Sequence, residues 1–201
     1  SSLNLIEHHV GKCDEYFYNG SIIINVGNNA KLDHVRIQNN SKTTINIKNL
    51  HIRQEANSDY SFIQFAFGSK LGRINLYADL IGEGANCALN GLSLSNNTQH
   101  LDAHIITNHQ AAHCSSSQNF KSILKDKSSG VFNGRSIVQA SAEKTDSRQS
   151  NKNLLLSKEA LMKSNPQLEI YTDDVKCSHG SSTGALESDA LFYIRSRGID
   201  Q

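Results

Sequence analysis

Apolar residues alternate with polar residues in a series of short segments along the chain. Gly, Asn, Ser and Asp separate the segments, and these residues favour turns. Because side chains alternate between the two faces of a β-strand, this period of two predicts half-buried strands with apolar residues facing a core. The apolar positions are Ile22, Ile24 and Val26; Ile45 and Ile47; Ile63, Phe65 and Phe67; Ile74, Leu76 and Ala78; Leu92 and Leu94; and Leu101, Ala103 and Ile105.

A turn rich in small residues recurs at a nearly constant interval. Its alanines are Ala30, Ala56, Ala85, Ala112 and Ala142, which lie 26, 29, 27 and 30 positions apart, and residues 174–177 form a degenerate sixth copy. Such a recurrence is typical of a parallel β-solenoid, in which one coil cannot bury its inner face alone and stacked coils share a core. A β-sandwich with Greek-key connections is the alternative.

The two ends of a solenoid differ from its middle. Inside the stack, burial of each large apolar side chain stabilises the folded state by about 1.5–3 kcal/mol. The end coils expose strand edges that must be capped or paired, so an uncapped terminal coil is suited to joining another chain. One helix is expected near the end of the sequence, where Leu186, Ala190, Leu191 and Ile194 form one face.

Composition narrows the functional classes. The 201 residues carry a formal net charge of +1, which gives no reason to expect a polyanion or a membrane surface as partner. No apolar run approaches the roughly 18 residues that span a bilayer, and the first residues do not resemble a signal peptide. Because the four cysteines form no CxxC pair, reduced thiols in a cytosolic protein are expected.

The segment 166–180 carries the most suggestive chemistry. It contains the only proline, a strand-like run, a Thr-Asp-Asp turn, and a second strand in which Val175, Cys177 and His179 share one face. A thiol and an imidazole on the same face can bind a soft metal or transfer a proton. The alternative is that both residues simply line the core.

Other candidate sites have weaker patterns. His100, His104, His109 and His113 lie near Cys114, and the pairs 100/104 and 109/113 are each expected to share a strand face, which suits zinc or iron; solvated or turn histidines are the alternative. His8, His9, His34 and His51 are interpreted as surface or strand-lining residues. The sequence has no P-loop, GxGxxG, GxSxG or HExxH motif, which argues against the corresponding nucleotidase, dehydrogenase, hydrolase and metalloprotease classes.

Asp173 and Asp174, five or six residues before His179, raise the alternative of a secreted β-helix enzyme that cleaves pectin-like polysaccharides with paired carboxylates. Ser178 stands where such enzymes have a glycine, and their other motifs are missing. Asx-type hydrogen bonding in a turn therefore explains the two aspartates better. An adhesive β-helix protein is a further alternative, and it too would need secretion.

The second half of the chain contains a dense series of motifs. They are GVFNG at 130–134, KTD at 144–146, NKNLLLS at 151–157, PQLEIY at 166–171, DDVKCSHG at 173–180 and LFYIRSRGI at 191–199. This series resembles the SufB/SufD core family of the SUF iron–sulfur cluster assembly system. The D-type subunit, SufD, is the better match, because Asn151 stands where B-type subunits carry a cysteine.

The resemblance implies a right-handed parallel β-helix that acts as a non-catalytic scaffold. It implies a heterodimer with SufB and binding of the ATPase SufC, which supplies nucleotide chemistry in trans. A transient iron–sulfur cluster would form at the SufB interface, with no stably bound cofactor. His179 matches a histidine near that junction, Cys177 matches a cysteine of the same motif, and both are candidate metal-binding, cluster-assembly residues. A cytoplasmic or plastid stromal location is expected.

The resemblance also predicts a division of the chain into a β-helix core at 1–185 and the start of a C-terminal helical region at 186–201. Family members normally have a segment before the solenoid and a helical region after it that docks SufC. The chain is therefore expected to be a core fragment that keeps the β-helix, binds SufC poorly, and can pair with itself through its uncapped edge.

Overall fold

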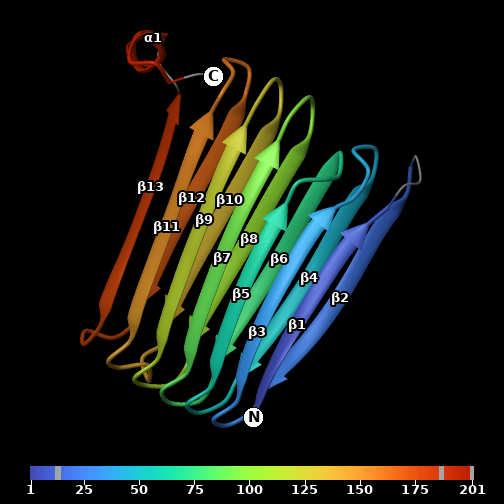
Figure 1. Ribbon diagram of the computed structural model, residues 1–201. Coiled ribbons are helices and arrows are strands. Elements are labelled where there is room, and N and C mark those ends of the chain that lie inside the picture. The colour runs from blue at the N-terminus through green and yellow to red at the C-terminus, as the bar shows by residue number, and fades with distance from the viewer. Residues whose placement is uncertain (12–14, 186–187, 200–201) are drawn as a thin grey trace.

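The computed structural model describes residues 1–201 except 12–14, 186–187 and 200–201, and it contains two parallel β-sheets that face each other (Figure 1). Sheet A contains β1 (Ser2–Val10), β3 (Lys31–Asn39), β5 (Asp59–Ala66), β7 (Asn86–Ser95), β9 (Ser115–Leu124), β11 (Asp146–Leu155) and β13 (Lys176–Ala185). Sheet B contains β2 (Phe17–Val26), β4 (Ile45–Gln54), β6 (Leu71–Leu80), β8 (His100–His109), β10 (Ser129–Val138) and β12 (Leu161–Ile170).

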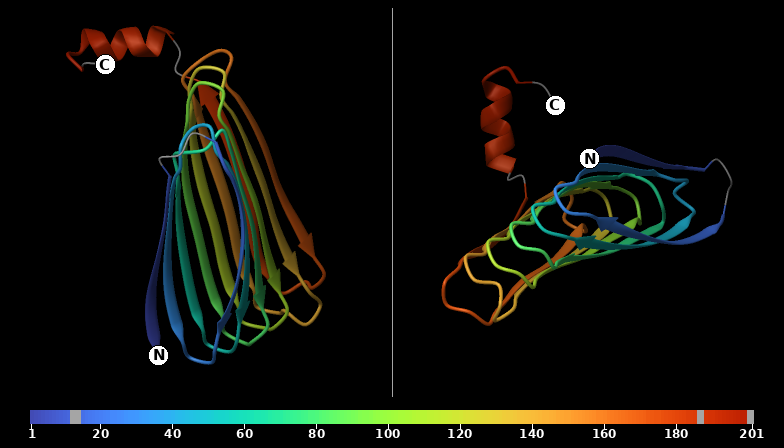
Figure 2. Two further views of the ribbon diagram at one scale, coloured as in Figure 1. Left: turned by 90° about the vertical axis from the view of Figure 1, so that its right-hand side faces the viewer. Right: turned by 90° about the horizontal axis from the view of Figure 1, so that it is seen from below.

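Successive strands alternate between the sheets, and each pairs in parallel with the strand two places earlier in the chain. The path is therefore a parallel β-solenoid of about six turns, and the views in Figure 2 show the coils stacked along one axis. The predicted fold class is confirmed, and the β-sandwich alternative is wrong. The expected helix is present as α1 (Ser188–Ser196), and Leu186, where the predicted helix begins, lies outside the described residues. Within the described residues, no helix is both long and apolar enough to cross a membrane.

The repeating turns stack on one another by backbone hydrogen bonds. Asn29 N–H donates to Ala56 O, Asn57 N–H to Glu83 O, Gly84 N–H to Ala112 O, His113 N–H to Glu143 O, and Lys144 N–H to Asp174 O. All five donor residues have positive φ, a conformation that Asn and Gly adopt more readily than other residues. The small-residue recurrence seen in the sequence, including its degenerate sixth copy, thus marks a ladder of stacked turns.

Gly82 lies where two of these turns approach closely. A Cβ atom at this position would overlap backbone atoms of Glu55 and Ala56 in the coil before it. We expect Gly82→Ala to lower the free energy of unfolding by about 1–3 kcal/mol, because the coils must separate locally. The matched control is Gly27→Ala in the first of these turns, where the added Cβ would meet only Glu55 Oε2 at 3.8 Å. Urea unfolding of the two variants measures the difference, and equal stabilities would contradict this packing argument.

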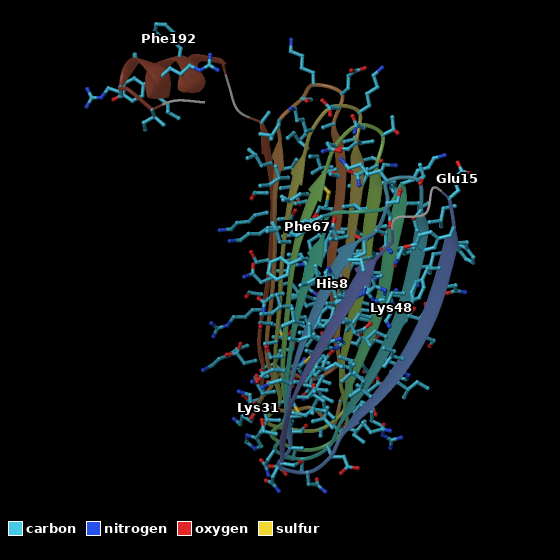
Figure 3. All side chains as sticks on the ribbon, turned by 45° about the vertical axis from the view of Figure 1, so that its right-hand side comes forward. His8, Glu15, Lys31, Lys48, Phe67 and Phe192 are labelled. Carbon is cyan, nitrogen blue, oxygen red and sulfur yellow. The ribbon has the colours of Figure 1, made fainter. Side chains whose placement is uncertain are left out.

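The interior contains more polar side chains than the sequence pattern predicts. The apolar rows at 22–26, 74–78 and 101–105 do face inward. The rows at 45–47, 63–67 and 92–94 face outward, so their predicted burial is wrong, and their polar neighbours Asn46, Lys48 and Gln64 are buried instead. Figure 3 draws the side chains on the ribbon and labels Phe67, which is half-buried, and Lys48, which is buried. The aliphatic and aromatic core occupies mainly the coils from Val26 to Ile105.

Candidate functional site

The C-terminal end of the solenoid is open and polar. β13 is the last strand of sheet A and pairs only with β11. Its register places Cys177 beside Ser147 and His179 beside Gln149, and because both β11 residues are buried, Cys177 and His179 lie on the inner face. No other strand of the described residues covers β13, and here Cys177 is half-buried and His179 is exposed. The structure therefore brings the two predicted site residues to the same face of an edge strand.

The approach to β13 is fixed by contacts with the preceding coil. Lys144 forms an ion pair with Asp174, and Lys176 N–H donates to Thr145 O at 2.8 Å. Asp173 and Asp174 are exposed and lie in the bend between β12 and β13. The two aspartates lie in a bend, as predicted, but the described contacts include no Asx-type hydrogen bond from either side chain. The bend is held instead by the backbone bond from Val175 N–H to Asp173 O and by the ion pair between Asp174 and Lys144. Pro166 lies in β12, the edge strand of sheet B, where its missing N–H is tolerated.

A layer of buried polar side chains lies directly beneath β13. These are the inward residues of β11, namely Ser147, Gln149, Asn151 and Asn153. Their register neighbours on β13 are Cys177, His179, Ser181 and Thr183, and the apolar pair Leu155 and Ala185 follows only at the end of the two strands. A motif search misses this layer, but its Ser-x-Gln-x-Asn-x-Asn spacing is a period-two pattern that a search for polar alternation would find.

Cys177 differs from the other described cysteines in its access to solvent. Cys87, Cys114 and Cys177 are free thiols, but Cys87 and Cys114 are buried, while Cys13 lies outside the described residues. Burial raises the pKa of the Cys177 thiol, a hydrogen bond with the Ser147 backbone opposes this, and Asp146 adds a further increase. The pKa of Cys87 is raised by burial alone. A bound cation would favour the Cys177 thiolate, which is the form that binds soft metals.

The structure does not bring together the histidines at positions 100, 104, 109 and 113. His100 and His104 lie on the outer face of β8, where His104 pairs with Asp102 at 3.0 Å. His109 faces inward, with its Nε2 2.8 Å from Ser116 Oγ, whereas His113 lies exposed in a turn, so the predicted common face of these two is wrong. Across the described part of the chain, no three His, Cys, Asp or Glu side chains group as metal ligands.

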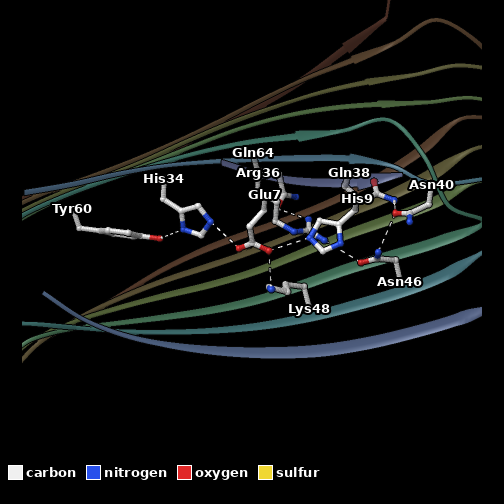
Figure 4. Close-up of polar contacts among 10 residues, drawn as sticks. All are labelled: Glu7, His9, His34, Arg36, Gln38, Asn40, Asn46, Lys48, Tyr60 and Gln64. Carbon is white, nitrogen blue, oxygen red and sulfur yellow. Dashed lines mark hydrogen bonds and ion pairs between the residues drawn. The ribbon is translucent and has the colours of Figure 1, made fainter. Parts of the chain in front are cut away.

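A second cluster of charged side chains is buried at the opposite end of the solenoid. Glu7 of β1 accepts hydrogen bonds from Lys48 Nζ at 2.9 Å and contacts His34 Nε2 at 2.8 Å and His9 Nε2 at 3.0 Å (Figure 4). His34 Nδ1 in turn lies 2.9 Å from the hydroxyl of Tyr60. His34 is thus a strand-lining residue of the interior, while His51 lies on the surface.

Arg36 extends this cluster without a carboxylate partner of its own. Its guanidinium donates to Gln64 Oε1 at 3.1 Å and to Asn46 Oδ1 at 3.0 Å. Burial lowers the pKa of Arg36 to about 10, against the opposing effect of Glu7, so the side chain remains charged at neutral pH. Burial would raise the pKa of Glu7, but the hydrogen bonds with His34, His9 and Lys48 hold it well below its usual range. Through Glu7, the cluster therefore links β1 to His34 of β3 in the same sheet and to Lys48 of β4 in sheet B.

The described residues form a parallel β-solenoid whose last strand, β13, carries a thiol and an imidazole on one face. The whole chain, residues 1–201, matches the family described as SUF system FeS cluster assembly, SufBD core domain, and it belongs to that family. This agrees with the resemblance recognised in the motifs at 130–199.

Two relatives from distant sources cover nearly all of the chain. The chain is 38% identical over 98% of its length to "Protein ABCI7, chloroplastic" of Arabidopsis thaliana and 35% identical over 98% to "Iron-sulfur cluster assembly protein SufD" of Escherichia coli (strain K12). It is 36% identical over 92% of its length to a SufBD family protein of Synechocystis. The matches cover 42%, 47% and 41% of those relatives, so the chain spans less than half of their lengths.

Proposed function

We propose that this chain is the β-solenoid core of a D-type scaffold subunit that pairs with a SufB-type subunit and builds iron–sulfur clusters at the junction. Residues 1–185 form the core in this proposal, and residues 186–201 begin a helical region. The open end of the solenoid carries the proposal, because β13 offers both an unpaired strand edge and two metal-binding side chains. ABCI7 and SufD relatives of chloroplast and bacterial origin are consistent with a stromal or cytoplasmic location.

Cys177 and His179 are the proposed cluster-assembly residues. Thiolate and neutral imidazole are both known ligands of iron in iron–sulfur clusters, which have four protein ligands in common forms. Two donors from one chain therefore suit a shared site, in which a sister subunit supplies the remaining ligands. Such a site exists only while the two subunits are joined, so the cluster is transient and its assembly can be controlled by movement of the dimer.

ATP hydrolysis is assigned to a SufC-type partner in this proposal, and the scaffold itself has no catalytic residue. The chain contains no phosphate-binding loop, and the charged cluster around Glu7 is enclosed within the solenoid. Movement driven by nucleotide binding would open or complete the junction at β13. A polysaccharide-cleaving enzyme is less well supported, because Asp174 is engaged with Lys144 in the turn.

Co-purification with SufB and SufC tests the proposal. We expect the full-length protein containing this chain to form a stable complex with both, and reconstitution under anaerobic conditions to give bound iron and sulfide in the complex but not in the isolated subunit. Size-exclusion chromatography and chemical quantitation of iron and sulfide measure these outcomes. A full cluster load on the isolated subunit, or no association with SufB, would overturn the proposal.

A further inference from the structure

Gln149 has an unusual environment for a buried amide. Its side chain is only 4% exposed, and neither its Oε1 nor its Nε2 has a hydrogen-bond partner. The neighbouring inward residues of β11 are engaged: Ser147 Oγ lies 3.0 Å from Ser116 Oγ, and Asn151 Nδ2 donates to Phe120 O at 3.1 Å. Leaving both ends of an amide unpaired in the interior is costly, so such a group calls for an explanation.

Gln149 lies next to His179 in the sheet. It is the direct register neighbour of His179, and both residues lie on the inner face of sheet A. Gln118, one coil deeper in the same row, differs in its Nε2, which donates to Thr107 Oγ1 and to Arg135 O at 3.1 Å each, while its Oε1 has no partner. The amide without partners is thus the one next to the exposed imidazole.

We propose that Gln149 is a positioning residue for His179 when His179 binds a metal ion. A neutral imidazole that binds metal through one ring nitrogen carries a proton on the other, and that N–H usually donates to a carboxylate, a carbonyl or water. The Oε1 atom of Gln149 supplies the acceptor from the adjacent strand. This contact selects the tautomer and fixes the ring orientation, and it satisfies the buried amide oxygen when the site is filled.

This inference rests on the proposed role of His179 but predicts a separate effect. Removing an unpaired buried amide should not weaken the fold, whereas removing the acceptor for the imidazole N–H should weaken metal binding. A merely structural glutamine would show the opposite combination, with a loss of stability and no effect on the metal. Gln149→Leu, which keeps the approximate size of the side chain, separates these two roles.

The experiment uses the full-length protein in complex with its SUF partners, with Co²⁺ as a spectroscopic probe under anaerobic conditions. The difference between wild-type and His179→Ala titrations defines the Co²⁺ bound through His179. We expect Gln149→Leu to weaken that binding by about 10- to 100-fold, with a changed d–d spectrum and an unchanged or higher Tm. Gln149→Glu, which keeps an acceptor oxygen, should retain most of the affinity. Gln118→Leu, the matched control, should lower the Tm and leave Co²⁺ binding unchanged.

The outcomes distinguish the inference from the function on which it rests. If His179→Ala leaves Co²⁺ binding unchanged, the proposed role of His179 fails. If His179→Ala weakens binding but Gln149→Leu does not, only the role of Gln149 is overturned. It is also overturned if Gln149→Leu and Gln118→Leu lower the Tm and the affinity to the same extent, since the effect would then be one of general packing.

Discussion

Replacing Glu7 with alanine is expected to lower the free energy of unfolding by about 3–5 kcal/mol, because it removes the carboxylate that neutralises a buried lysine. The side chain of Lys48 is 1% exposed and that of Glu7 is 12% exposed, so little water is available to solvate the ammonium group left behind. The same substitution removes the contact with His34 at 2.8 Å, which ties β1 to the next coil of sheet A. Urea unfolding followed by circular dichroism measures the loss.

Two controls test the cause. The first is Glu159→Ala, which removes an ion pair with Lys127 in which both side chains are 66% exposed. This substitution should change the free energy of unfolding by less than about 0.5 kcal/mol. The double substitution Glu7→Leu with Lys48→Met should recover much of the loss, since an apolar pair of similar volume replaces the buried ion pair. If the double variant does not regain stability, the loss in Glu7→Ala comes from the interactions of the carboxylate with His34 and Arg36 rather than with Lys48.

The same carboxylate makes stability depend on pH. The pKa of Glu7 is held below its usual range in the folded state. The ionised carboxylate therefore makes its full contribution to the free energy of unfolding above the unfolded-state pKa of about 4.3. This contribution is lost progressively as the pH falls below that value. Glu7→Gln should therefore show a shallower loss of stability between about pH 5 and pH 3 than the wild type. Burial lowers the pKa of His109 to about 4, but that group is present in both proteins and cancels in the comparison.

The path of the chain was predictable because its turns carry a local signal. Small residues and residues tolerant of positive φ must recur wherever turns stack, and they do so at Ala30, Ala56, Ala85, Ala112 and Ala142. The direction that each row of side chains faces was harder to predict. Ile63 alternates with Gln64, and simple hydrophobicity puts the isoleucine inside. The amide is inside because it accepts a hydrogen bond from the buried guanidinium of Arg36, a partner 28 residues away in the sequence.

At the candidate site, too, the face on which a side chain lies was predictable from the local sequence, but its neighbour on the adjacent strand was not. Period-two alternation correctly placed Cys177 and His179 on one face of a strand. It did not identify Gln149, because the pairing of β11 with β13 depends on the length of the intervening coil, which includes all of β12. The histidines at 100–113 failed as a group for a related reason: β8 ends at His109, so the alternation does not continue to His113.

His179→Ala is expected to abolish cluster build-up in the complex with SufB and SufC while leaving the fold and the assembly of the complex intact. The imidazole is exposed on the edge strand, so its removal creates no cavity in the core and should change stability by less than about 0.5 kcal/mol. The effect on the cluster should be large, because a shared site that loses one of its few ligands cannot hold iron in the same coordination. Iron and sulfide per complex, measured after anaerobic reconstitution, is the direct readout.

His51→Ala provides the matched control on the same chain. His51 is also an exposed strand histidine, but it lies on the outer face of sheet B, 2.7 Å from Asp79 and away from β13. Its loss should leave the iron and sulfide content unchanged, so a fall in both variants would point to a general effect of removing surface histidines. A normal cluster load with His179→Ala in an intact complex would exclude this imidazole as a ligand. The edge strand would then act only as the joining surface between the two scaffold subunits.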